Sequence, residues 1–296
     1  MSGKLGALEA QIGTAQQLQA VVSAMRGIAA ARAREAEGRL AGIRSTAATV
    51  AAAIAEVLRV EPDRRAAAAA AAAADETRSA VQSRARHLVI AMGSEQGFVG
   101  MFNEPILDAA TRALQSGPCE LIVTGTRGAT TAEERGLPVA WSTPMVTHAD
   151  DVPGFAGNVT DELYRRLEDS LIRRVSIIHA RPALATQTEV VQRQLIPFDF
   201  ARFHVASRKQ PPLLTLPADK LLTGLAEAYV YTELCEAAAL SLAAENEARV
   251  RAMMSAHANL KDRLDALTQR YRLVRQDEIT SDIVELTAAA SVARTD

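Results

Sequence analysis

The sequence predicts an α/β protein in which two long helices, one at each end of the chain, form an antiparallel coiled coil. A central Rossmann-like, doubly wound α/β domain is predicted between them. Two observations support this fold class: a heptad pattern in both terminal segments, and alternating strand-like and helix-like runs in the middle. Aromatic residues are only 4% of the chain, which favours closely packed, alanine-rich helices. We predict a helix over 1–60, a connector over 61–86, the α/β domain over 87–210 and a second helix over 211–296.

The N-terminal helix is predicted by sixteen positions that follow one another in alternating steps of three and four residues. Fourteen of them are apolar, and Gln19 and Arg26 are the exceptions. A seven-residue repeat of this kind is typical of a left-handed coiled coil, and the helix would be roughly 80 Å long. No globular domain buries such a rod along its length, so a partner helix is required. The seam positions are Leu5, Leu8, Ile12, Ala15, Gln19, Val22, Arg26, Ala29, Ala33, Ala36, Leu40, Ile43, Ala47, Val50, Ile54 and Val57.

The C-terminal segment supplies that partner. Its seam reads Val250, Met253, His257, Leu260, Leu264, Leu267, Tyr271 and Val274, then slips by one residue to Ile279, Ile283 and Leu286. Neither proline nor glycine occurs after Gly224, so about 70 residues can form one helix on the order of 100 Å long. Two such helices at opposite ends of one chain pair most simply as an antiparallel coil, with the longer C-terminal helix overhanging.

The middle of the chain predicts the α/β domain. Strand-like runs occur at 87–92, 120–124, 139–142, 175–180 and 189–196, with helix-like runs at 103–115, 130–135 and 159–168 between the first four. This alternation favours an open, mostly parallel sheet, with the last strand as an antiparallel edge. The connector contains nine alanines (66–74) and is expected to be helical, while Pro211, Pro212 and Pro217 precede the last helix.

Composition excludes several classes of protein. The formal charge of −2 gives no basic field for nucleic acid. Two distant cysteines, Cys119 and Cys235, offer neither a disulfide framework nor metal-ligand spacing, which suits a reducing compartment. The N-terminus lacks the apolar core of a signal peptide, and no run reaches the ~20 apolar residues of a membrane span. We expect a soluble, cytosolic chain that reaches a membrane only through a partner.

The loop "GSEQGFVG" (93–100) raises the possibility of a phosphate site, because three glycines follow a strand and precede a helix. A P-loop requires a lysine after its last glycine, and the dinucleotide fingerprint requires the spacing G-x-G-x-x-G. This loop has neither, and Glu95 would repel an anion there. The loop is therefore interpreted as a strand-to-helix turn in which glycines permit unusual φ angles and close packing.

Other chemical motifs are missing from the sequence. The five histidines show no metal-ligand spacing, and neither a G-x-S-x-G elbow nor a plausible Cys/His pair occurs. We predict no catalytic, cofactor-binding or metal residues. Asp150 and Asp151 are expected in a solvated loop, and the four arginines at 165, 166, 173 and 174 on a charged helix face and strand start. Glu245 and Arg249 have the i, i+4 spacing of an ordinary helix pair.

Three segments resemble the gamma subunit of the F-type rotary ATP synthase. The first, "HLVIAMGSEQGFVGMFNEPIL", matches the central signature at Ser94, Gly97, Gly100, Phe102 and Asn103, with Glu95 in place of the usual aspartate. The second, "SLAAENEARVRAMMSAHANLKDRLDALTQRYRLVRQDEITSDIVEL", resembles the C-terminal signature at Ser241, Glu245, Arg249, Met253, Asn259, Leu267, Arg275, Gln276, Ile279, Thr280 and Glu285, with Asp282 replacing glutamate. The third, "AMRGIAAARAREA", places Met25 at the family's N-terminal methionine.

The resemblance implies a non-catalytic rotor at the cytoplasmic face of the bacterial inner membrane. Its coil would turn inside a hexamer of alpha and beta subunits, and its α/β domain would sit on the membrane c-ring with the epsilon subunit. Ion flow through the ring would thus change the conformation of each catalytic beta subunit. The residues implied to contact beta subunits are Met25, Glu245, Arg249, Arg275, Gln276, Thr280 and Asp282.

Departures from the family pattern indicate a divergent branch, such as an alternative rotary ATPase. Phe98 and Val99 replace a Leu-Cys pair, and Glu9 occupies a start that is usually more basic. Two other classes stay open at this point. A free-standing coiled-coil scaffold would form a stable homodimer, and a nucleotide-binding α/β enzyme would bind ATP or NAD tightly on its own.

Overall fold

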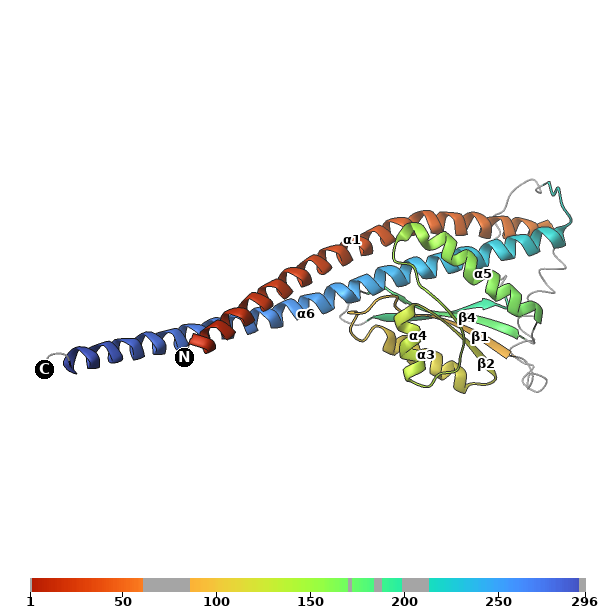
Figure 1. Cartoon of the computed structure of the whole chain (residues 1–296). Helices are drawn as coiled ribbons and strands as arrows, with labels where there is room; N and C mark the ends of the chain where they lie inside the picture. The colour runs from red at the N-terminus through yellow and green to blue at the C-terminus, as the bar shows by residue number, and fades with distance from the viewer. Residues whose placement is uncertain (1, 61–85, 170–171, 184–187, 199–212, 293–296) are drawn as a thin grey trace. The chain divides into compact units, whose positions relative to one another are not determined.

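The computed structural model of the chain describes residues 2–60, 86–169, 172–183, 188–198 and 213–292 (Figure 1). The polyalanine connector, most of the predicted 61–86 segment, and the Pro211-Pro212 pair lie outside the described residues. The chain divides into two compact units. The first contains 1–29 and 250–296, and the second contains 30–249.

Two long helices supply the ends of the chain. Helix α1 spans Ser2–Val60 and helix α6 spans Ala218–Val292, so each runs through parts of both units. Fifteen of the sixteen seam positions predicted for α1 are buried or half-buried, and the exception is Arg26, which is exposed. The heptad pattern therefore identifies the buried face of α1 almost residue by residue.

In the first unit, the beginning of α1 pairs with the end of α6. The hydroxyl of Tyr271 donates to the carboxylate of Glu9 at 2.7 Å, and the seam residues Leu8 and Ala15 are buried. Seven residues of α1 precede Glu9, whereas 21 residues of α6 follow Tyr271. The helices are antiparallel and α6 overhangs, as the sequence predicts.

The seam of α6 is covered only as far as its partner extends. All eight seam positions from Val250 to Val274 are buried or half-buried. After the slip in the repeat, the side chains of Ile279, Ile283 and Leu286 are more than half exposed. The slip thus marks the place where the intramolecular coil ends.

The second unit contains the α/β domain. Among the described residues, five strands form one sheet in the order β3-β2-β1-β4-β5. The strands are β1 (Arg86–Met92), β2 (Cys119–Thr124), β3 (Val139–Thr143), β4 (Ile172–Arg181) and β5 (Glu189–Ile196). The first four are parallel and β5 pairs with β4 in the antiparallel direction. The predicted doubly wound sheet with an antiparallel edge is confirmed.

Two of the connecting helices begin earlier than the sequence predicts. Helix α3 (Asn103–Gln115) has the predicted bounds, but α4 spans Thr126–Glu134 and α5 spans Val152–Asp169. Pro153 lies in the first turn of α5, where the missing amide hydrogen costs no helical bond. Asp150 and Asp151, expected in a solvated loop, form a 3-10 turn (Ala149–Asp151) that leads into α5.

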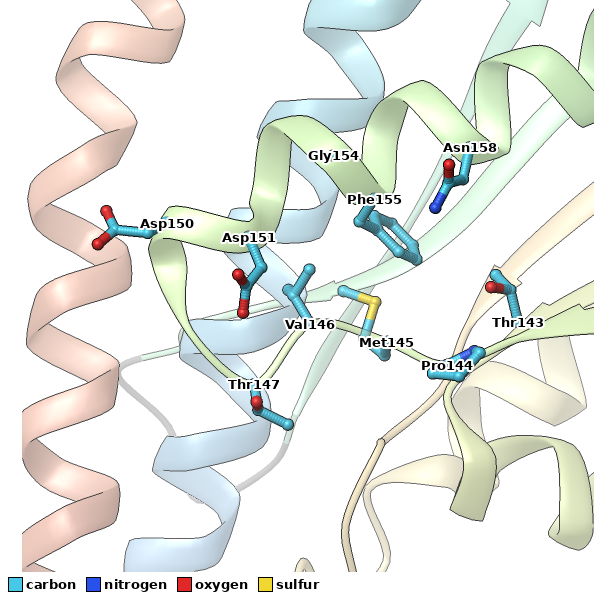
Figure 2. Close-up of a pocket in the computed structure, with 10 residues that line it drawn as sticks. All are labelled: Thr143, Pro144, Met145, Val146, Thr147, Asp150, Asp151, Gly154, Phe155 and Asn158. Atoms are coloured by element: carbon cyan, nitrogen blue, oxygen red, sulfur yellow. The ribbon is translucent and has the colours of Figure 1, made fainter.

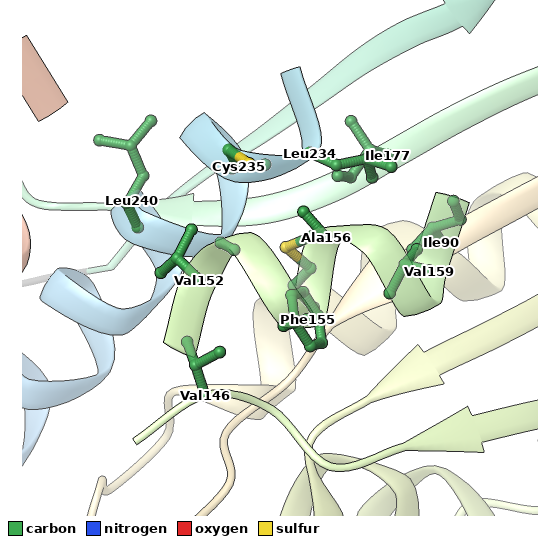
Figure 3. Packing of buried hydrophobic residues seen from close by; sticks show 14 of the residues in the cluster. Ile90, Val146, Val152, Phe155, Ala156, Val159, Ile177, Leu234, Cys235 and Leu240 are labelled. Carbon is green, nitrogen blue, oxygen red and sulfur yellow. The ribbon is translucent and has the colours of Figure 1, made fainter. Parts of the chain in front are cut away.

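The sheet has a hydrophobic cluster on each face. Leu88, Ile90 and Met92 of β1 pack with α5, α6 and the later part of α1, while Val89 and Ala91 pack with α3 and α4. Figure 3 shows Ile177 of the sheet beside Leu234 of α6, and Ile90 beside Val159 of α5. Three layers result, since α3 and α4 cover one face and the other helices cover the opposite face.

Helix α6 changes sides at one end of the sheet. Its buried residues up to Ala243 belong to the α5-side cluster, whereas Ala244 and Ala248 belong to the α3-side cluster. The hydroxyl of Ser241 accepts a hydrogen bond from the amide of Ala180, next to the last residue of β4. Helix α6 therefore passes the carboxyl edge of the sheet near residues 241–248.

One described helix, α1 between Lys4 and Val60, is long and apolar enough to cross a membrane by composition alone, with a mean hydropathy of 1.3 in its most apolar window. This differs from the expectation that no run would qualify. Alanine counts as apolar on a hydropathy scale, so an alanine-rich helix can pass without a continuous run of large apolar side chains. Helices of soluble proteins pass the same test.

Candidate functional site

The loop after β1 lies against the turn after β2 at backbone contact. The amide of Gly93 donates to the carbonyl of Thr124, and the amide of Gly128 donates to the carbonyl of Ser94, both at 2.9 Å. A Cβ atom on Gly93 would lie only 2.7 Å from the Cα of Gly128. Glycine is required here for close packing, which is the role that the sequence predicts for it.

Ser94 and Asn103 close the same loop. The amide of Ser94 donates to Oδ1 of Asn103 at 2.8 Å, and Nδ2 of Asn103 donates to the Ser94 hydroxyl at 2.9 Å. Both side chains are buried, and Asn103 is the first residue of α3. This reciprocal pair fixes the exit of β1 relative to the start of α3.

Glu95 does not face the loop that contains it. Its carboxylate accepts hydrogen bonds from the amide and the hydroxyl of Thr126, at 2.9 and 2.7 Å, and from the amide of Met145 at 2.7 Å. The negative charge lies at the first residue of α4, where the helix dipole favours it. The expectation that Glu95 would repel an anion from the loop is therefore wrong, because its side chain leaves the loop amides to another acceptor.

That acceptor is Glu245 of α6. The amides of Glu95 and Gln96 donate to its two carboxylate oxygens at 3.1 and 3.3 Å. Arg249, one turn further along α6, donates to the carbonyls of Gly97 at 3.2 Å and Gln96 at 3.4 Å, and to Glu245 at 2.5 Å. We call Glu245, Arg249 and the backbone of 94–97 the carboxylate clamp.

The two side chains of the carboxylate clamp are buried. Glu245 is 3% exposed and Arg249 is 5% exposed. Burial raises the pKa of Glu245, and the hydrogen bond and charge of Arg249, with the two loop amides, offset part of that rise. Asn246 accepts from Arg249 at 2.9 Å and donates to the carbonyl of Leu242. No buried side-chain nitrogen or oxygen among the described residues lacks a partner.

The two candidate contact residues of the clamp belong to a different unit from the others. Glu245 and Arg249 lie in the second unit, whereas Met25, Arg275, Gln276, Thr280 and Asp282 lie in the first. The four on the end of α6 are exposed, and Met25 on α1 is half-buried. The Thr280 hydroxyl donates to the Gln276 carbonyl one turn earlier, as is common on an exposed helix.

A cavity of about 510 Å³ lies between the end of β3 and the start of α5 (Figure 2). Asp150 at its rim points toward α1, where it pairs with Arg39. Polar and apolar side chains share the lining: Thr143, Pro144, Met145, Val146, Thr147, Asp150, Asp151, Gly154, Phe155 and Asn158. The charged side chains of the lining, Asp150 and Asp151, are both acidic, so this cavity does not suit an anionic ligand.

Two arginines of the predicted charged cluster form structural ion pairs. Arg166 contacts Glu162 at 2.6 Å and Glu120 of β2 at 2.8 Å, while Arg165 also binds Glu162. The hydrogen bond from Arg165 holds the pKa of Glu162 below its usual value. Arg173 and Arg174 are exposed on β4. In the part of the chain that the structure describes, no group of three or more His, Cys, Asp or Glu side chains could hold a metal ion.

This fold and this site define a class of protein. The two ends of one chain form a helical shaft, and the loop of the α/β domain that would hold a phosphate in a nucleotide enzyme holds a carboxylate of the chain's own helix. Such a protein is a coiled-coil shaft joined to an α/β domain whose glycine loop binds a side chain of the same polypeptide.

The family model described as ATP synthase matches residues 4–292. The ATP synthase gamma chain of Gluconacetobacter diazotrophicus is 27% identical over 96% of this chain and 97% of its own length, and that of Fuscovulum blasticum is 28% identical over the same shares. This chain therefore belongs to the ATP synthase gamma-chain family.

Solved structures share the fold. The rotor of the Euglena gracilis mitochondrial ATP synthase aligns with a TM-score of 0.63 at 15% identity, covering 94% of this chain and all of the other. A second structure of that synthase, with OSCP, F1 and c-ring, aligns with a TM-score of 0.67 at 12% identity, covering 99% of this chain and 95% of the other.

Proposed function

We propose that this chain is the central-stalk rotor subunit of a rotary ATP synthase, coupling ion flow through a membrane ring to conformational changes in catalytic subunits. The observation that carries the proposal is the overhang of α6: 21 residues of α6 follow Tyr271, only seven residues of α1 precede its partner Glu9, and Ile279, Ile283 and Leu286 are exposed. Apolar area in water costs about 25 cal/mol per Å², and a row of it on a helix indicates a protein partner.

The partners that fit are the alpha and beta subunits around the coil, with the epsilon subunit and the membrane c-ring at the α/β domain. Support comes from the matched solved structures, which are described as a rotor, an OSCP/F1/c-ring assembly and a central stalk with c-ring. The chain would be a peripheral protein at the cytoplasmic face of the bacterial inner membrane. It would contribute no catalytic residue of its own.

Exposed polar groups near the end of α6 supply the proposed beta-subunit contacts. Arg275, Gln276, Thr280 and Asp282 present donors and acceptors from the same stretch of helix that carries the exposed apolar residues. Met25 would contact a beta subunit from α1.

Glu245 and Arg249 remain candidate beta-subunit contacts, but their burial suggests a different route. Both side chains form hydrogen bonds with the backbone of the 94–97 loop. Gln96 in this loop and Phe98 next to it are exposed. We propose that the pair acts on a partner through this loop by fixing its conformation.

Copurification tests the function directly. The full-length chain, expressed with its alpha and beta subunits, should elute with them as one complex that hydrolyses ATP, while the chain alone should show no hydrolysis. A stable homodimer that excludes alpha and beta subunits would support the scaffold instead, and ATP hydrolysis by the isolated chain would contradict a non-catalytic rotor.

A further inference from the structure

The carboxylate clamp lies where a doubly wound domain ordinarily binds its ligand. The chain leaves β1 toward β2 on one side, and β4 lies on the other side of β1, so the strand order reverses there. The loops at the carboxyl ends of the strands at such a switch point form the ligand crevice of this fold. Here α6 passes that edge, with Ser241 at the end of β4 and Glu245 at the loop after β1.

The chemistry of the clamp is that of an anion site. Two successive backbone amides, of Glu95 and Gln96, converge on one carboxylate, and the guanidinium of Arg249 provides the positive charge. Successive amides and an arginine are the donors that proteins use for carboxylates and phosphates. Arg249 also holds the carbonyls of Gln96 and Gly97, so the same residue orders the loop that supplies the amides.

We propose that the 94–97 loop and Arg249 form an anion-binding site whose built-in ligand is the carboxylate of Glu245. The site docks α6 onto the α/β domain as a tethered ligand. The class of ligand is a small carboxylate, because two amides and one guanidinium match the two oxygens of that group. All contacts of this site lie within the chain, so the site is present whether or not the chain is a rotor.

Chemical rescue of the isolated full-length chain tests the site. In Glu245→Ala, hydrogen exchange at the amides of Glu95 and Gln96 should accelerate about tenfold or more, because both lose their acceptor. Sodium formate should restore much of the protection, whereas sodium chloride at equal ionic strength should not. Unchanged exchange at these amides, or equal effects of the two salts, would overturn the proposal.

Glu233→Ala is the matched control. Glu233 is also a buried carboxylate of α6 with an arginine partner, Arg193 of β5, but it makes no hydrogen bond to the 94–97 loop. Its removal should lower global stability without a local effect at Glu95 and Gln96, and formate should change nothing. Local acceleration at those amides in this control, or a formate response, would mean that the effect is general and not that of a site.

Glu245→Gln provides a second test of the site if the alanine variant fails to fold. The amide retains the size of the side chain and one carbonyl acceptor but fills the site, so exchange should rise by a smaller factor and formate should give no rescue. A formate response in Glu245→Gln, with the site already filled, would contradict the assignment.

A second arm of the test rests on the proposed function. If the chain is a rotor, a docked α6 carries rotation into the α/β domain, so in assembled complexes on vesicles Glu245→Ala should lower the ions moved per ATP hydrolysed, with partial recovery in formate. An unchanged ratio, with the exchange result positive, would leave the anion site standing and refute its mechanical role. Failure to assemble with alpha and beta subunits even in the unaltered chain would instead refute the proposed function.

Discussion

The carboxylate of Glu95 accepts a hydrogen bond from the amide of Met145 at 2.7 Å, across fifty residues of sequence. Because the same carboxylate also binds the amide and hydroxyl of Thr126, it joins the segments that follow β1, β2 and β3. One side chain therefore holds together the carboxyl edge of the sheet, beside the clamp.

Glu95→Ala should destabilise the α/β domain. It removes three hydrogen bonds, two of them to the first residue of α4, and the expected loss is about 2–3 kcal/mol in the free energy of unfolding. Urea denaturation followed by circular dichroism measures it. Glu133→Ala, an exposed glutamate on α4, is the control and should change stability by about 0.5 kcal/mol or less. Equal effects of the two substitutions would contradict the linking role of Glu95.

Gly93→Ala should be more damaging than its size suggests. The added Cβ would meet the Cα of Gly128 at 2.7 Å, so backbone must move, at a cost of about 3 kcal/mol. Gly157→Ala in α5 has open space around the new Cβ and should instead stabilise the chain by about 0.5–1 kcal/mol. Thermal unfolding of both variants checks the sign as well as the size, and a neutral Gly93→Ala would mean that the two loops do not touch.

Stability should fall as pH decreases from about 6.5 toward 4, in part because of His87. Burial, helped by the charge of Arg174, lowers the pKa of His87 to about 4, and its ring bonds the Ser176 hydroxyl at 2.7 Å. In the unfolded chain His87 binds a proton near pH 6.5, whereas in the folded chain it does so only near pH 4, so acid favours unfolding. Since the ring is only partly buried, we expect a loss of about 1 kcal/mol.

His87→Gln separates this effect from the acid titration of carboxylates. Glutamine can still bond Ser176 but does not titrate, so the thermal midpoint should fall less between pH 7 and 5 than in the parent chain. Parallel pH profiles for the parent and His87→Gln would show that His87 titrates alike in the folded and unfolded states.

The double substitution Arg275→Ala and Gln276→Ala should leave folding nearly intact, because both side chains are exposed. If they contact beta subunits, it should weaken assembly or coupled ATP turnover by tenfold or so, which is about 1.4 kcal/mol. Gln269→Ala with Arg270→Ala, an exposed pair of the same residue types on α6, is the control. Normal assembly and turnover in the first variant would remove both residues from the contact surface.

The coiled coil could be predicted almost completely because its signal is local. Alternating steps of three and four residues place side chains on one face of a helix, whichever helix packs against it. Of the sixteen seam positions predicted for α1, only Arg26 is exposed. The alternation of strands and helices similarly predicted the sheet. The start of α4 was missed because it depends on Gly125, with a φ of 93°, and on a cap from Glu95, which lies 31 residues before Thr126.

The clamp could not be predicted in the same way. Glu245 and Arg249 have the spacing of a helix surface pair, and nothing within their own segment indicates that they reach a loop about 150 residues earlier. Glu95 was misread for a related reason, since its position in a glycine loop does not reveal which way its side chain turns. The resemblance picked out both segments but gave no contact between them.

Antiparallel pairing of the two ends also sets an order of events during synthesis. Glu9 leaves the ribosome 262 residues before Tyr271, which at 5–20 residues per second is a wait of roughly 13–50 s. Throughout that time the beginning of α1 lacks its partner helix, and the amides of the 94–97 loop lack their acceptor until Glu245 emerges. The nascent polypeptide thus exposes the apolar positions of its first thirty residues for most of its translation, so a holdase chaperone should engage this stretch until the last helix is synthesised.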